Sequence, residues 1–153
     1  MNLPLEQLRV REATDDDART IRAMLTGELL VAGYGAPSEH RYGDLVDLAY
    51  YRIPGRYLWV ALDSEERVAG CGALEPRSPA VARLHRMAGR GLRNIVSAAV
   101  KFAQDSGYAA IEAFPPVGMD YDDAERLFAS RGFAPPYMEG GSRPFRRILR
   151  RPE

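Results

Sequence analysis

The sequence predicts a mixed α/β fold in which helices pack on a central β-sheet. Three observations indicate it. Short β-prone apolar runs, bounded by glycine, proline or charged turns, recur along the chain, and segments with helical spacing separate them. The chain has 153 residues, 46% of them hydrophobic, which is enough for one sizeable core. We therefore expect a single domain over residues 1–153, with about six to seven strands and about four helices.

The N-terminal third is predicted to form one strand and two helices. Residues 8–12 alternate apolar and charged side chains, as a strand does. Thr14 is followed by three aspartates, which favour the start of a helix, and apolar residues then recur at helical spacing. A second helix is expected from about Ser38 to Ala49, before the break at Pro54.

Three strands are predicted in the middle of the chain. Residues 57–62 and 68–74 are β-prone apolar runs joined by a charged turn, so they are expected to pair as a hairpin. Residues 81–87 follow as a third strand of this group. Fold class and chain order together place all three in one sheet.

The remaining third begins with the clearest helical pattern. A helix is expected from Leu92 to a C-terminal cap at Gly107, because its apolar residues recur on one face. Residues 108–114 predict a strand, residues 122–130 a short helix, and the chain from Phe133 a last hairpin.

Charge and cysteine content exclude several classes of function. The 21 basic and 21 acidic residues leave no net charge, so the expected partners include neither nucleic acid nor a membrane. The single cysteine, Cys71, is flanked by glycines and is expected in the core, and one thiol can form neither an internal disulfide nor a metal cluster. We expect a cytoplasmic protein that is a monomer or a homodimer.

The junction between the strand at 81–87 and the helix at Leu92 is the strongest chemical signal. Gly89 and Gly91 lead the strand directly into the helix. Glycines at such a position let backbone N–H groups close on an anion, and the helix N-terminus adds partial positive charge. A tight turn without any ligand explains the same glycines equally well.

In this context the chain resembles the GNAT superfamily of N-acetyltransferases. The pyrophosphate loop of that family has the pattern Arg/Gln-x-x-Gly-x-Gly/Ala, which Arg86, Gly89 and Gly91 match. Residues 124–133 are similar to the family signature Ala-x-x-x-Phe/Tyr-x-x-x-Gly-Phe. The resemblance covers nearly the whole chain and implies a GNAT-like mixed sheet flanked by helices.

The resemblance implies transfer of an acetyl group from acetyl-CoA to a primary amine of a small-molecule or peptide acceptor, without a metal. The pyrophosphate would lie on backbone N–H groups of the glycine loop and the pantetheine arm along the preceding strand. The residues implied in binding acetyl-CoA are Leu84, Arg86, Met87, Gly89, Arg90, Gly91, Leu92 and Arg93.

Two departures from the family pattern support an alternative function. The stretch before the glycine loop is shorter than usual, and Phe128 stands where many members carry a tyrosine that protonates the leaving thiolate. The alternative is a catalytically silent GNAT-like domain that binds acyl-CoA or a protein partner.

Three residues are candidates for moving protons. His85 is the candidate base, because its ordinary pKa is near neutrality and it lies on the strand implied at the donor site. Glu75 could act through a water, and Tyr121 could replace the missing tyrosine. A packed histidine and a loop carboxylate are the simpler interpretations of the first two. The acceptor site is expected among the following side chains: Tyr34, His40, Tyr42, Tyr50, Tyr51 and Tyr137.

Overall fold

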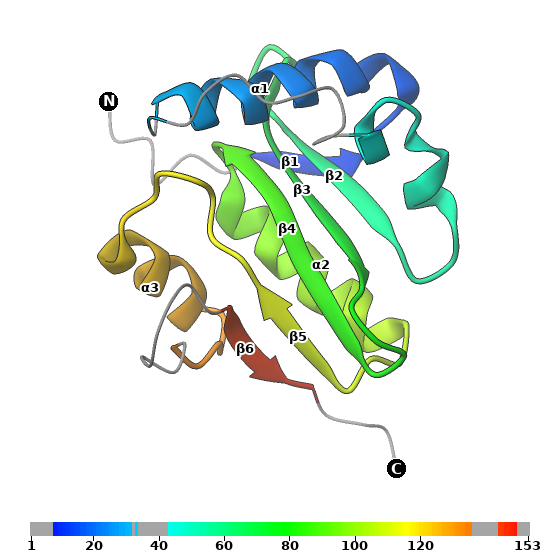
Figure 1. Ribbon diagram of the computed structural model, residues 1–153, viewed down its shortest axis with the longest axis vertical. Coiled ribbons are helices and arrows are strands. Elements are labelled where there is room, and N and C mark those ends of the chain that lie inside the picture. Colours follow the sequence, from blue (N-terminus) through cyan, green and yellow to red (C-terminus); the bar gives the residue numbers. More distant parts are fainter. Residues whose placement is uncertain (1–7, 32, 34–42, 136–143, 150–153) are drawn as a thin grey trace.

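A computed structural model of the chain describes residues 8–31, 33, 43–135 and 144–149. These residues form one six-stranded sheet in the order β1-β2-β3-β4-β5-β6 (Figure 1). All neighbouring strands are antiparallel except β4 and β5, which are parallel. This mixed sheet agrees with the predicted fold class and with the predicted number of strands.

The elements closely follow the predicted boundaries. The strands are β1 (Arg9–Glu12), β2 (Tyr57–Leu62), β3 (Val68–Pro76), β4 (Val81–Gly89), β5 (Ala110–Ala113) and β6 (Phe145–Ile148). The α-helices are α1 (Ala18–Val31), α2 (Leu92–Asp105) and α3 (Tyr121–Ala129). Short 3-10 helices are η2 (Asp15–Asp17), η3 (Gly43–Leu45) and η4 (Leu48–Arg52).

Each face of the sheet carries its own apolar core. On one face, α1, η3 and η4 cover residues of β2 and β3, including Val60 and Ala73. On the other, α2 and α3 pack against Trp59, Leu84 and Met87 among others. Figure 1 shows α1 and α2 on opposite sides of the sheet. Alternate side chains of each central strand therefore point into different cores.

The first helix begins with a cap that the aspartate run supplies. Thr14 and Asp17 form a capping box, in which the Asp17 carboxylate accepts a hydrogen bond from the Thr14 N–H at 2.8 Å. Arg11 of β1 donates to the same carboxylate at 2.7 Å. Burial opposes ionisation of Asp17, but the hydrogen bonds from Arg11 and Thr14 outweigh it and lower its pKa. The cap thus joins β1 to α1.

The second predicted helix differs from the structure. Residues 34–42 lie outside the described part of the chain, and the rest of the predicted span forms η3 and η4. The Asp47 side chain accepts a hydrogen bond from the Ala49 N–H at 3.0 Å, which starts a new short helix instead of continuing one. The described residues accordingly contain three α-helices, not the four helices expected.

Helix α2 has the orientation that its apolar pattern predicts. Ile95 and Ala99 are fully buried against the sheet, whereas Lys101 and Gln104 are exposed. Gly91 is the N-cap, with a φ of 75°. The helix therefore begins directly at the end of the β4 strand.

We expect Ile95→Ala to lower the free energy of unfolding by about 2–5 kcal/mol, because it removes fully buried methyl groups and leaves a cavity between α2 and the sheet. Urea denaturation measures the loss. Gln104→Ala, at an exposed position of the same helix, is the matched control and should change stability by less than about 0.5 kcal/mol. Equal effects at the two positions would contradict the packing of α2.

Candidate functional site

Strands β4 and β5 separate half-way along β4. Val81–Leu84 of β4 pair with Ala110–Ala113 of β5, and the last bond of this region runs from the Phe114 N–H to the Leu84 carbonyl oxygen at 2.9 Å. Pro115 and Pro116 come next, and proline has no N–H to extend the pairing. Strand β4 continues to Gly89 while β5 turns away (Figure 1). The second half of β4 thus has a backbone edge that β5 does not cover.

A bulge shapes the same half of β4. Ala73 pairs with His85 and Cys71 with Ala88, so two residues of β4, Arg86 and Met87, lie opposite Gly72 alone. Arg86 has a φ of 56°, in the left-handed region. Because of the extra residue, His85 and Ala88 face α1, and Met87 packs into the α2 core.

The two glycines at the end of β4 are both required by close packing. A Cβ at Gly89 would lie 2.2 Å from the Ala69 carbonyl oxygen, and one at Gly91 would lie 2.6 Å from the Ala61 Cβ. Both have positive φ. The Arg90 N–H donates to the Ala69 carbonyl oxygen at 2.8 Å. A tight turn therefore accounts for both glycines, and their presence alone does not indicate an anion.

The first turn of α2 offers backbone donors at the same place. Its first intrahelical bond joins the Ile95 N–H to the Gly91 carbonyl oxygen at 3.1 Å, so the preceding N–H groups of the turn have no acceptor within the helix. Arg93 is exposed on this turn. Arg131, which follows α3, donates from Nε to the Arg93 carbonyl oxygen at 3.3 Å. Burial and the Arg93 charge lower the Arg131 pKa, so two guanidinium groups already repel each other beside these donors.

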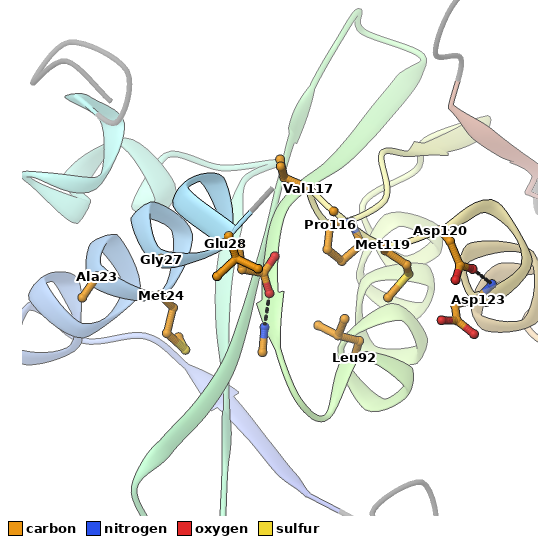
Figure 2. Close-up of a pocket in the computed structure, with 13 residues that line it drawn as sticks. Ala23, Met24, Gly27, Glu28, Leu92, Pro116, Val117, Met119, Asp120 and Asp123 are labelled. Atoms are coloured by element: carbon orange, nitrogen blue, oxygen red, sulfur yellow. Dashed lines mark hydrogen bonds between the residues drawn. The ribbon is translucent and has the colours of Figure 1, made fainter. Parts of the chain in front are cut away.

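A cleft of about 620 Å³ opens next to this turn, between α1 and the loop that joins β5 to α3 (Figure 2). Its walls are largely apolar, with Met24 on one side and Pro116, Val117 and Met119 on the other. The full lining is Ala23, Met24, Gly27, Glu28, Val31, Gly89, Leu92, Pro116, Val117, Gly118, Met119, Asp120 and Asp123.

The ionisable residues of the lining are all carboxylates. Asp120 caps α3 by accepting from the Asp123 N–H at 2.8 Å, and Asp123 forms an ion pair with Arg126. Glu28 differs, because its Oε1 accepts the Gly89 N–H at 3.1 Å while its Oε2 is buried with no hydrogen-bond partner among the described residues. Figure 2 shows this contact between α1 and the end of β4.

Burial raises the pKa of Glu28, although the hydrogen bond from Gly89 acts in the opposite direction. Its carboxylate accepts a hydrogen bond from one N–H group of the glycine loop, and this loop is the one that resembles a phosphate site. Glu28 cannot be predicted as a site residue from the sequence, since a glutamate in an amphipathic helix is normally solvent-facing and nothing in the sequence relates it to residue 89.

A second polar group, the Glu75 cluster, lies where β4 and β5 separate, on the α1 face of the sheet. It consists of Tyr50, Arg56, Glu75, Arg83 and His85. The Tyr50 hydroxyl donates to Glu75 Oε2, and Arg83 Nη1 lies 3.7 Å from Oε1. The Arg56 guanidinium carbon lies 4.7 Å from the centre of the Tyr50 ring. The structure thus brings two predicted catalytic residues, His85 and Glu75, together.

Burial holds the His85 pKa below its ordinary value in this cluster. Its Nε2 lies 3.2 Å from Glu75 Oε1, but it is not aligned to form a hydrogen bond. Burial lowers the His85 pKa; the Glu75 charge opposes this shift, and Arg86 and Arg83 add to it.

Tyr121 lies away from this cluster. It is the first residue of α3, and its ring stacks on Phe145 of β6 with 6.1 Å between ring centres. Phe128 is fully buried between Phe133 and Phe145, at 5.5 and 4.9 Å between ring centres. The position that carries the tyrosine of the family pattern is therefore a core position in this chain.

The residues implied in acetyl-CoA binding have different environments. Gly89 and Leu92 line the cleft and Arg93 is exposed beside it. The Leu84 and Met87 side chains are buried in the α2 core, so only their backbones could contact a ligand. Arg86 forms an ion pair with Asp44 at 3.0 Å.

Two further predictions concern Cys71 and the residues expected to bind the acceptor. Cys71 is fully buried, as expected; burial raises its pKa to about 12, and its Sγ donates to the Arg86 carbonyl oxygen at 3.3 Å. Tyr50 and Tyr51 lie beside Glu75 and Asp44, respectively. The other predicted acceptor residues lie outside the described part of the chain: Tyr34, His40, Tyr42 and Tyr137.

No protein-family model matches this sequence, and no curated protein matches it by sequence. Solved structures match it closely. An acetyltransferase of the GNAT family from Staphylococcus aureus Mu50 superimposes with a TM-score of 0.73 over 94% of this chain and 99% of that chain, at 14% identity. The chain has the GNAT fold.

Two other GNAT structures agree. A phosphinothricin acetyltransferase from Sinorhizobium meliloti, in complex with AcCoA, matches with a TM-score of 0.72 over 94% of this chain and 89% of that chain, at 17% identity. A GCN5-related N-acetyltransferase from Kribbella flavida matches with a TM-score of 0.67 over 93% and 98%, at 22% identity. The GNAT fold thus spans nearly the whole chain, as the sequence resemblance implies.

Two findings concern membranes and metals. Among residues 8–31, 33, 43–135 and 144–149, no helix is long and apolar enough to cross a bilayer. The same residues contain no group of three or more histidine, cysteine, aspartate or glutamate side chains placed to hold a metal ion.

We expect Glu28→Gln to stabilise the protein near neutral pH. The folded-state pKa of Glu28 is raised, so the buried charge costs stability above that pKa, and the cost disappears as the carboxyl is protonated. Glutamine keeps an oxygen for the Gly89 N–H and removes the charge. Urea midpoints of the two proteins should differ near neutral pH and converge below the ordinary carboxyl value of 4.5.

Glu125→Gln, at an exposed position of α3, is the control and should not show this pH-dependent gain. A Glu28→Gln midpoint equal to that of the unmodified protein at every pH would show that the Glu28 carboxylate is not held in a desolvated position.

Proposed function

We propose that this protein transfers an acetyl group from acetyl-CoA to a primary amine of a small acceptor. The observation that carries the proposal is the separation of β4 from β5 beside the open first turn of α2, within a GNAT fold. The uncovered edge of β4 can bond the amide groups of a pantetheine arm as a neighbouring strand would. Relatives in fold include acetyltransferases, one of them in complex with AcCoA.

Acetyl-CoA would bind with its charged pyrophosphate at one end of the cleft and with its apolar arm along the cleft. Its pyrophosphate would take the N–H groups at the start of α2, where Arg93 and Arg131 add positive charge. The apolar walls of the cleft suit the arm. In this arrangement the thioester would lie near the point where β4 and β5 separate, next to the Glu75 cluster.

His85 is the proposed base of the reaction. It removes a proton from the acceptor ammonium, and the free amine attacks the thioester carbonyl carbon. Backbone N–H groups of β4 would stabilise the oxyanion that forms. The carbon–sulfur bond then breaks, and the second amine proton neutralises the departing thiolate. The sum is one amide, one free thiol of CoA and one proton released from His85 to solvent.

Glu75 and Tyr121 have different roles in the proposed reaction. Glu75 lies beside His85 Nε2 and accepts the Tyr50 hydroxyl, so it is a positioning residue here, and a route through water remains the second choice for the base. The Tyr121 ring packs on Phe145, away from the Glu75 cluster, so Tyr121 is a candidate acid only because of its place in the sequence.

Specific contacts favour the alternative of a catalytically silent domain. Two N–H groups of the glycine loop are already bonded within the protein, Gly89 to Glu28 and Arg90 to Ala69. A carboxylate at the loop repels phosphate, and Phe128 cannot supply a proton. Release of CoA thiol from acetyl-CoA, measured with a panel of amines, distinguishes the two functions: a silent domain releases none above the rate in buffer.

We expect Arg93→Ala to weaken acetyl-CoA binding about two- to fivefold, the size of one exposed charge pair, in a calorimetric titration. The same change should raise the stability of the free protein by about 0.3 kcal/mol or more, because a positive charge in the first turn opposes the helix dipole.

Lys101→Ala is the matched control, an exposed basic residue near the other end of α2 that pairs with Asp105 at 2.9 Å. It should lower stability slightly, by up to about 0.5 kcal/mol, and leave the affinity unchanged. Affinities that fall equally in both variants would contradict a phosphate site at the start of α2.

We expect His85→Gln to lower the rate of acetyl transfer by at least about 10²-fold, with acetyl-CoA binding unchanged. Because the His85 pKa lies below its ordinary value of 6.5, the base is free at neutral pH and the acidic limb of the rate profile falls below that value. The limb should be absent from the variant. Full activity with the same limb would make His85 a structural residue.

A further inference from the structure

We infer that the acceptor amine carries a carboxylate, as an amino acid does, and that Arg83, supported by Arg56, binds it. This inference rests on the proposed acetyl transfer and adds the substrate class. Its basis is an excess of positive charge in the Glu75 cluster, at the place where the acceptor would meet the thioester.

The charge excess follows from how the carboxylates of this region are used. Asp44 is paired with Arg86 at 3.0 Å. Glu112, which lies beside Arg83 in the pairing of β4 with β5, forms ion pairs with Arg77 and Arg146. Glu75 lies 3.7 Å from Arg83, and Arg56 stacks on the Tyr50 ring, whose hydroxyl donates to Glu75. Burial lowers the pKa of His85, so the five residues of the cluster contain two positive charges and one negative charge.

Glu75 does not form a hydrogen bond with Arg83. Its Oε2 accepts the Tyr50 hydroxyl, and its Oε1 lies 3.2 Å from His85 Nε2. Arg83 Nη1 is 3.7 Å from Oε1, which is too long for a hydrogen bond. The Nε atoms of Arg56 and Arg83 are buried with no hydrogen-bond partner among the described residues. Guanidinium donors in a half-buried site require an acceptor, and a carboxylate matches their planar geometry.

Arg83 is the most accessible of the three cluster residues that come from β3 and β4. Its side chain is 40% exposed, against 15% for Glu75 and His85. Its guanidinium carbon lies 5.7 Å from the centre of the Phe114 ring, at the residue where β5 leaves β4. The contact with the ring holds the guanidinium beside the point where the two strands separate.

The spacing along β4 matches a small acceptor. Arg83 and His85 are two residues apart on the same face of the strand, which places their Cβ atoms roughly 7 Å apart. One molecule can then present its amine to His85 and its carboxylate to Arg83 only if the two groups are separated by a few bonds. An amino acid has this arrangement, whereas a simple alkylamine leaves Arg83 without an acceptor.

The experiment compares amino acids, the matched amino acid amides and simple alkylamines as acceptors at saturating acetyl-CoA. The unmodified protein should show the lowest KM with the carboxylate-bearing acceptors. Arg83→Gln should raise KM for these acceptors by about tenfold or more, the size of a charged hydrogen bond, without a comparable change for the amides or a fall in kcat. Arg83→Lys should recover part of the loss.

Arg67→Gln is the matched control, because Arg67 is an exposed arginine that pairs with Asp63 at 3.3 Å in the turn between β2 and β3, away from the Glu75 cluster. It should leave every KM unchanged. Binding can also be measured without turnover. The CoA complex of the unmodified protein should bind N-acetyl amino acids more tightly than the matching N-acetyl amino acid amides. Arg83→Gln should remove this preference for the carboxylate.

Each of the remaining outcomes of the experiment would contradict either the role of Arg83 or the proposed acetyl transfer. Equal KM values for amino acids and amides, or a preference that survives in Arg83→Gln, would overturn the inference and leave acetyl transfer intact. An Arg83→Gln protein with lower kcat for all acceptors would assign Arg83 a structural role. Failure of the unmodified protein to acetylate any amine would contradict the proposed function itself.

Discussion

The site depends on one constraint, the end of pairing between two parallel strands. The bond from Phe114 to Leu84 is followed by two prolines, so β5 has no further N–H to offer at the very point where β4 must continue. The β4 backbone beyond that point is not paired with β5. The cleft, the start of α2 and the Glu75 cluster are all arranged around this divergence.

The start of α2 carries positive charge that favours an anion, whereas a carboxylate beside it disfavours one. Arg93 and Arg131 lie close together at the start of α2, which favours an anion there. Glu28 reaches the adjacent Gly89 N–H from α1 and places a carboxylate where a phosphate group would compete for the same donor. Binding of acetyl-CoA would therefore have to displace or neutralise Glu28. The protein can act as an acetyltransferase only if the free energy gained by binding the phosphate groups exceeds the cost of breaking the contact between Glu28 and Gly89.

Local patterns in the sequence predicted most of the fold but few of the site contacts. Strand alternation and the apolar face of α2 gave elements within a few residues of those observed, since burial fixes both. The second helix was wrong because the Asp47 side chain starts a separate 3-10 helix. The pairing of Arg86 with Asp44, and the contact between Glu28 and Gly89, join residues 42 and 61 positions apart, for which one sequence contains no signal.

The bulge at Arg86 decides where strand β4 can change in length. Removing one residue there would restore continuous pairing opposite Gly72 while His85 stays opposite Ala73 and Ala88 stays opposite Cys71, so the later side chains of β4 would keep their faces. An insertion or deletion after Ala88 has no such bulge to absorb it, and it would displace Gly89 and Gly91, which are packed tightly against β2 and β3. Chains that share this arrangement should therefore vary in length at the bulge more readily than at the junction with α2.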